Sequence, residues 1–217
     1  MSVRLRATLV FAGVLVALAL IVVYLVGYLA VAPPTVQGAS GSQAQLTLQT
    51  VAAIGSGDRP DWVSYLVKDP SGQWVHSTIW TVPANSTIQV TVYQYDSASQ
   101  LRNNFWAQPQ GIDANSYAVN GKTMDSIPAE TASHTFAIPD LGISVPLQGI
   151  PDDAKNPCSA APCDSSSDHE TMTFSFHTGA PGKYRWQCFV PCGAGFLFGN
   201  GGPMSTIGFM GGFLEVV

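Results

Sequence analysis

Two cysteines near the C-terminus, Cys188 and Cys192, are the side chains of this chain best suited to chemistry. Three residues separate them, and they follow the strand-like run Lys183 to Gln187. Paired soft sulfur donors favour Cu(I), zinc or iron–sulfur clusters. If the protein binds redox copper, we expect this segment to hold it, because no other stretch offers as many soft donors.

Cys188 is expected at the end of the second strand of a C-terminal hairpin. We predict that Thr171 to Phe176 and Lys183 to Cys188 form the two strands. Because side chains alternate along a strand, Tyr184, Trp186 and Cys188 share one face, which the aromatic residues mark as the inner one. The alternation therefore predicts a buried Cys188 sulfur beside an indole ring.

The exported part of the chain has the pattern of an all-β domain. Apolar and polar residues alternate in segments separated by glycine, proline and asparagine, and no capped helical period follows the N-terminal segment. The clearest strands are Leu46 to Val51, Thr87 to Tyr93, Thr171 to Phe176 and Phe209 to Val217. We predict a Greek-key β-sandwich over residues 44–217, with one N-terminal transmembrane helix.

Two other stretches differ from this pattern. Residues 33–43 are rich in proline, glycine, serine and glutamine, and are predicted to be a spacer. Residues 148–170 are predicted to be an inserted loop, because their many aspartate, serine and proline residues cannot supply a packed strand. Within this loop we expect Cys158 and Cys163 to form a local disulfide rather than a metal site, as cysteines do in an oxidising compartment.

Residues 1–32 are predicted to be a membrane anchor. Ala7 to Val31 carries no charge and is long enough to span the hydrocarbon core as a helix. Arg4 and Arg6 precede it, so the positive-inside rule places the β domain on the extracytoplasmic side. The alternative is a signal peptide cleaved near residues 30–32, but the apolar run far exceeds the roughly 7–15 residues of a signal-peptide core.

The chain of 217 residues is acidic, with a formal net charge of -5. Arg4 and Arg6 belong to the anchor, so the exported part has 7 basic residues against 14 acidic ones and a charge near -7. This balance excludes nucleic acid as an expected partner. It suits attraction of a basic soluble protein, although ordinary solubility also explains it.

Two segments resemble the subunit II family of haem-copper oxidases. His134 to Pro146 resembles the segment that carries this family's first copper histidine, and Pro181 to Gly195 resembles its Pro-Gly-x-Tyr run into Cys-x3-Cys-Gly-x-Gly. The resemblance implies a cupredoxin-like β-sandwich with copper as its cofactor. It also implies electron transfer, or an accessory docking role, in a respiratory chain.

Carried over position by position, the resemblance implies a ligand set that this chain supplies only in part. His134 matches the first histidine, and Cys188 and Cys192 match the thiolates that bridge two copper ions. The carbonyl of Val190 matches a weak oxygen donor. The family's second histidine is absent, because Phe196 stands four residues after the second cysteine.

The family's methionine is absent as well, since Gly199 stands in its position. Met204 follows, and we expect it to be a displaced thioether ligand if the loop before it is extended. Three states remain open for the site, the first being a disulfide between Cys188 and Cys192. The second is a Cu(I) site formed by His134, one of the two thiols and Met204, and the third is an intact dinuclear centre.

The other histidines do not supply the missing imidazole. His177 is expected on the polar face of its strand, and His76 lies upstream of every site element. His169, in the inserted loop, is the alternative that would fold over the site. His134 itself is either a ligand or a hydrogen-bonded histidine at a strand end. Phe196 to Phe198, between glycines, form either a core plug in place of the metal edge or an apolar flap that docks on a partner or the membrane.

Three classes of function follow. The first is a membrane-anchored protein like oxidase subunit II, with a basic cytochrome or an oxidase subunit as partner. The second is capture and delivery of Cu(I), and the third is a metal-free partner-binding domain. No catalytic residue is predicted, because the apolar setting of Cys188 and Cys192 gives no sign of the lowered pKa that a nucleophile needs. The protein is expected to be at most a non-catalytic subunit of a cytochrome oxidase-type complex.

Overall fold

The computed structural model describes residues 2–29, 35–37, 43–52, 62–192 and 202–217. The chain divides into two compact units, Met1–Pro33 and Pro34–Val217.

The N-terminal unit is one apolar helix. α1 spans Val3–Tyr24 and continues as a π-helical turn, η1, over Leu25–Leu29. The Ser2 side chain accepts a hydrogen bond from the backbone N–H of Leu5 and so caps the first turn. The stretch Val3–Gly27 is long and apolar enough to cross a membrane, which makes it a candidate anchor or signal sequence.

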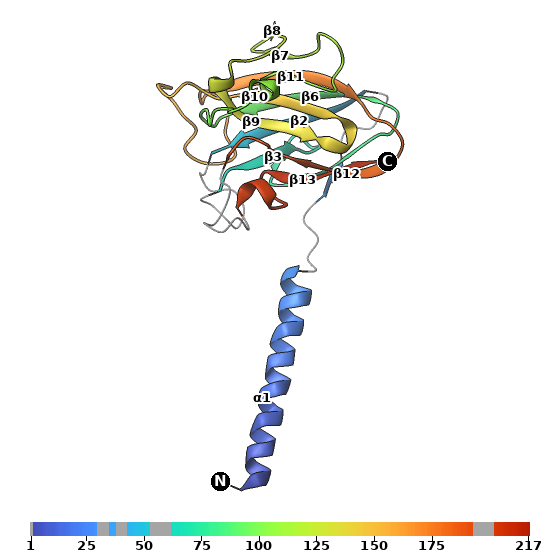
Figure 1. Cartoon of the computed structure of the whole chain (residues 1–217), viewed down its shortest axis with the longest axis vertical. Coiled ribbons are helices and arrows are strands. Elements are labelled where there is room, and N and C mark those ends of the chain that lie inside the picture. The colour runs from blue at the N-terminus through green and yellow to red at the C-terminus, as the bar shows by residue number, and fades with distance from the viewer. Residues whose placement is uncertain (1, 30–34, 38–42, 53–61, 193–201) are drawn as a thin grey trace. The chain divides into compact units, whose positions relative to one another are not determined.

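The second unit is a sandwich of two mixed β-sheets (Figure 1). The first sheet has the strand order β1-β5-β13-β12-β9-β10, and the second has the order β4-β3-β2-β6-β11-β7-β8. The strands are β1 (Thr35–Gln37), β2 (Gln43–Val51), β3 (Ser64–Lys68), β4 (Trp74–Val75), β5 (Ile79–Val82), β6 (Thr87–Gln94), β7 (Ala118–Val119), β8 (Lys122–Thr123), β9 (Ala132–Ile138), β10 (Ile143–Gln148), β11 (Glu170–His177), β12 (Gly182–Gln187) and β13 (Gly211–Val216). The predicted all-β sandwich with one N-terminal helix is confirmed.

Short elements complete the unit. Single turns of 3-10 helix are η2 (Asn104–Ala107), η3 (Ala129–Thr131), η4 (Pro139–Leu141) and η5 (Pro203–Ser205). β1 lies within the stretch predicted to be a spacer and pairs in parallel with β5, so these three residues belong to the first sheet.

The predicted pairing of residues 171–176 with residues 183–188 is wrong. β11 pairs with β6 and β7 in the second sheet, whereas β12 pairs with β13 and β9 in the first. The chain between β11 and β12 therefore crosses from one sheet to the other. Periodicity did not reveal this, because a hairpin and a crossover give inward side chains the same alternation. The inward face of β12 is nevertheless as predicted, since Trp186 and Cys188 are fully buried.

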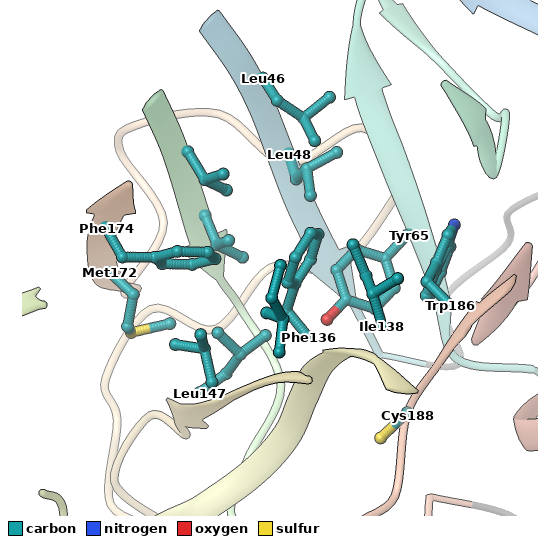
Figure 2. Packing of buried hydrophobic residues seen from close by; sticks show 14 of the residues in the cluster. Leu46, Leu48, Tyr65, Phe136, Ile138, Leu147, Met172, Phe174, Trp186 and Cys188 are labelled. Carbon is teal, nitrogen blue, oxygen red and sulfur yellow. The ribbon is translucent and has the colours of Figure 1, made fainter. Parts of the chain in front are cut away.

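Aromatic rings pack the core between the sheets beside Cys188 (Figure 2). Trp80 and Trp186 stack with ring centroids 4.5 Å apart, and Tyr65 meets Trp186 edge-on at 5.0 Å. Such offset and edge-on arrangements are the favoured geometries of aromatic pairs. The Trp186 indole N–H donates to the carbonyl of Thr78, so this buried polar group is satisfied. The rigid packing fixes the position of β12 immediately before Cys188.

The inserted loop is docked on the outer face of the second sheet. The predicted disulfide between Cys158 and Cys163 is confirmed. Cys163 packs with Val51, Leu66 and Tyr95 in a second, smaller hydrophobic cluster. The disulfide therefore helps attach the loop to the sheet, beyond the local role expected from its short spacing.

Gln49, a fully buried residue of β2, holds this loop by both ends of its amide. Its Oε1 accepts from the Cys163 N–H at 2.8 Å, and its Nε2 donates to the Cys163 carbonyl at 3.4 Å. We expect Gln49→Ala to lower the free energy of unfolding by about 1–3 kcal/mol, because it leaves buried backbone groups without partners. Gln45→Ala, at an exposed position of the same strand, is the control and should change stability by less than about 0.5 kcal/mol. Equal effects of the two substitutions in denaturant titrations would contradict this role of Gln49.

Candidate metal centre

Three predicted donors come together inside the sandwich. His134 lies on the inward face of β9 and is fully buried. Cys188 directly follows β12, and its backbone N–H donates to the Met210 carbonyl just before β13. Cys192 is 7% exposed and belongs to the same hydrophobic cluster. The cluster thus draws on β9 and on the connection between β12 and β13.

The distances within this cluster are those of a candidate metal site. The ligand atoms of His134, Cys188 and Cys192 all lie within 4.8 Å of one another, and His134 Nδ1 is 3.7 Å from Cys188 Sγ. Both cysteines are free thiols, so the disulfide that was the first expectation is not formed in this structure. Among the described residues, no other group of three or more histidine, cysteine, aspartate or glutamate side chains is close enough to hold a metal ion.

Backbone groups fix the Cys188 sulfur in place. The Thr135 N–H donates to Sγ at 3.4 Å, and the carbonyl oxygen of Val190 lies 3.6 Å from it. The Thr135 hydroxyl in turn accepts from the Phe189 N–H at 2.8 Å, which ties the start of the cysteine loop to β9. The resemblance implied the Val190 carbonyl as a weak oxygen donor, and the structure places it next to this sulfur.

Asp96 is the site residue that the sequence analysis missed. Its Oδ2 accepts from His134 Nε2 at 3.1 Å, which leaves Nδ1 directed at Cys188. A carboxylate that holds one ring nitrogen while the other faces the metal is the common outer-shell arrangement of histidine ligands. The alternation of side chains along β6 could have pointed to it. Asp96 lies two residues beyond Gln94, which is on the inward face of that strand.

Hydrogen bonds link Asp96, His134, Cys188 and Cys192 in one line, and they shift the pKa values of its members. Burial raises the pKa of the Cys188 thiol, but hydrogen bonds with Cys192 and His134 outweigh it and hold that pKa well below its ordinary value. The hydrogen bond to Cys188 and burial both raise the pKa of Cys192. Burial lowers the pKa of His134, whereas Asp96 and Cys188 raise it more, to about 9. These shifts favour the thiolate form of Cys188 and the protonated form of His134, contrary to the expectation that the Cys188 pKa is not lowered.

Met204 is close to this region without a described contact to the sulfurs. It lies on η5, is half-buried and packs against the hydrophobic cluster that contains both cysteines. Its role as a thioether ligand stays a prediction. Phe196 and Gly199, which stand at the family's histidine and methionine positions, and the predicted apolar flap at Phe196 to Phe198 lie outside the described residues.

The other histidines lie away from the cluster. His177 is exposed at the end of β11, as predicted. His169 packs against the rings of Tyr93 and Tyr95 on the outer face of the second sheet, so it does not fold over the site. His76 meets the Phe209 ring edge-on, with centroids 5.3 Å apart.

The donor set fits copper. Thiolates and thioethers select Cu(I), and imidazole suits copper in either oxidation state. Asp96 holds Nε2 of His134 and leaves Nδ1 directed at Cys188, so His134 has to release only its Nδ1 proton to ligate an ion. The lowered pKa of Cys188 favours the thiolate form that binds metals. Burial of the cluster excludes water from it.

No family model and no curated protein matches this chain. Among solved structures, the copper protein rusticyanin is similar at 18% identity, over 86% of this chain and 85% of the other, with a TM-score of 0.38. A structure of rusticyanin from Thiobacillus ferrooxidans has 17% identity, over 86% and 84%, with a TM-score of 0.39. Reduced rusticyanin has 15% identity, over 86% and 87%, with a TM-score of 0.34. Similarity this weak does not assign the chain to that family.

We expect the metal-free protein with reduced Cys188 and Cys192 to carry a thiolate at neutral pH. The ultraviolet absorbance of the thiolate, followed as pH is raised, should already be present well below the pKa of about 8.5 of a free cysteine. Cys188→Ser should remove this absorbance, and His177→Ala, at an exposed histidine, should leave it unchanged. An absorbance that first rises in the alkaline range would show that Cys188 is an ordinary buried thiol.

Proposed function

We propose that the chain is a membrane-anchored, extracytoplasmic copper protein of the cupredoxin class that transfers electrons. The observation that carries the proposal is the cluster of His134 Nδ1 with the sulfurs of Cys188 and Cys192, inside a β-sandwich and with Asp96 behind the imidazole. His134, Cys188 and Cys192 would hold the ion, with Met204 as the further ligand implied by the resemblance. Copper bound there would supply reversible one-electron chemistry.

Electron transfer is favoured over catalysis because the site is enclosed and already ordered. The three donors are at most 7% exposed, which leaves no open position for a substrate among the described residues. Backbone hydrogen bonds and the Asp96 carboxylate hold Cys188 and His134 before any metal binds. Ligands held in place by surrounding hydrogen bonds move little when the ion changes charge.

The resemblance to oxidase subunit II and the charge of the exported domain support a place in a respiratory chain. A basic cytochrome is the partner that suits a domain charge near -7, because opposite charges accelerate encounter. The helix α1 would hold the domain at the membrane surface with its oxidase partner. In this role the protein is an electron-transfer or docking subunit without an oxygen-reducing site of its own.

Capture and delivery of Cu(I) is the second candidate, and the composition of the donor set favours it. The described cluster has two sulfurs and only one imidazole, a combination that prefers Cu(I) to Cu(II). A delivery protein would bind Cu(I) tightly, show no strong visible colour and release the ion to a chelator or partner. An electron-transfer protein would keep its copper through cycles of oxidation and reduction.

Copper titration of the purified domain separates these candidates. We expect stoichiometric copper and a coloured oxidised form with an electron paramagnetic signal. His134→Ala, Cys188→Ser and Cys192→Ser should each lose the colour and the signal. His177→Ala should bind as the wild type does. Stoichiometric Cu(I) without a coloured, reversible oxidised form would favour delivery. A wild-type domain with free thiols that binds no copper would overturn both candidates.

Removal of the Asp96 carboxylate tests how the imidazole is held. We expect Asp96→Asn to weaken copper affinity roughly 10- to 100-fold, as loss of an outer-shell carboxylate typically does. The control is Asp69→Asn, at an exposed aspartate whose side chain caps a turn through Ser71 and Gln73. Competition with a copper chelator measures both affinities. If Asp96→Asn binds copper as tightly as the wild type, Asp96 does not position the ligand.

A further inference from the structure

Three polar side chains lie side by side on the inner face of the second sheet. Thr50 of β2 is the cross-strand partner of Tyr65 in β3 and of Gln94 in β6. All three are fully buried, and the inward positions that precede Gln94 on β6 are core residues. Tyr65, Thr50 and Gln94 thus form one polar row across three neighbouring strands, in a face that is otherwise apolar.

Contacts at or near both ends of this polar row lead to β9, the strand that carries His134. The Tyr65 hydroxyl donates to the Thr135 carbonyl at 3.3 Å, and burial and then the charges of the two site cysteines raise the pKa of Tyr65. At the other end, Asp96, two residues beyond Gln94, accepts from His134 Nε2. Tyr65 and Asp96 thus contact two neighbouring residues of β9, Thr135 and His134, and Thr50 and Gln94 belong to the strands between those contacts.

Contacts among the described residues do not explain why the polar side chains of Gln94 and Thr50 are buried. Neither Gln94 Oε1, nor Gln94 Nε2, nor Thr50 Oγ1 has a hydrogen-bond partner among the described residues, although all are buried. Each such group keeps the full cost of losing its water unless something satisfies it. Gln49, the neighbour of Thr50 on the opposite face of β2, shows the usual outcome, because both of its amide ends are bonded.

We propose that Gln94 Oε1 is a further ligand of the copper held by His134, Cys188 and Cys192. This inference rests on the proposed function. A side-chain amide oxygen is an established weak axial donor to copper bound by sulfur and imidazole. Thr50 Oγ1 is the buried acceptor in the neighbouring position for the amide N–H groups of Gln94. A donor from β6 would supply a ligand that the cysteine loop lacks.

The amide oxygen also has a chemical consequence. An oxygen donor is harder than a thioether, so it stabilises Cu(II) relative to Cu(I) and lowers the reduction potential of the centre. This counteracts the preference of two sulfurs for Cu(I). Gln94 would thereby make both oxidation states accessible in a site with a single described imidazole.

The test compares Gln94→Met, Gln94→Leu and Gln94→Glu in the full-length protein loaded with copper. We expect all three to retain copper on the two sulfurs and His134, with altered paramagnetic and visible spectra. The reduction potential should rise in Gln94→Met and Gln94→Leu, and fall in Gln94→Glu, whose carboxylate favours Cu(II). Ser144→Ala is the control, because Ser144 Oγ is also buried and unpartnered among the described residues but lies on β10. It should leave the spectra and the potential unchanged.

The opposing explanation is that an ordered water satisfies the polar row. In that case the Gln94 variants that bind copper would keep wild-type spectra and potential and change only the free energy of unfolding, which would overturn the proposal. This failure is distinct from failure of the proposed function, in which the wild-type protein itself would bind no copper. If Gln94→Leu does not fold, the same comparison between Gln94→Met and Gln94→Glu decides the question.

Discussion

A line of hydrogen bonds from the partly exposed Asp96 through the buried His134 to Cys188 joins the two sheets of the sandwich. Asp96 follows β6 of the second sheet, whereas His134 and Cys188 belong to β9 and to the end of β12 in the first. A charged group inside a sandwich is expensive unless it is paired. Because each of these side chains forms a hydrogen bond with the next, the cost of burying their charges is offset.

The line also explains why the site lies at one end of an otherwise apolar core. At the level of Phe136 and Phe174 the sheets meet through aromatic and aliphatic side chains only. Thr50 and Gln94, by contrast, are buried polar residues on the inner face of the second sheet. Aromatic packing holds the two sheets together, whereas hydrogen bonds with Asp96 and with the Thr135 N–H hold His134 and Cys188 in position.

The sequence predicted the sandwich because its strands alternate. The disulfide between Cys158 and Cys163 followed from their short spacing in a loop that was expected to be exported. It did not predict which strands pair. The crossover between β11 and β12 has the same local period as a hairpin, so only the sheet register distinguishes them.

In the site, too, the residues that belong to a local motif were predicted, and those placed by the packing of the sheets were not. The resemblance singled out His134, Cys188 and Cys192, and the structure brings them together. Asp96 and Gln94 carry no motif, and their relation to the site depends on which residues of the second sheet face β9. The lowered pKa of Cys188 was missed as well, because it comes from hydrogen bonds with Cys192 and with His134, and the histidine is more than fifty residues away in the chain.

X-ray absorption at the copper edge of the loaded protein tests the central claim most directly, because it counts the atoms bound to the metal. The account predicts sulfur neighbours from both cysteines together with a single imidazole nitrogen, and loss of one sulfur in Cys192→Ser. A copper shell of nitrogen and oxygen alone, with both thiols still free, would show that the cluster of His134, Cys188 and Cys192 is not the metal site.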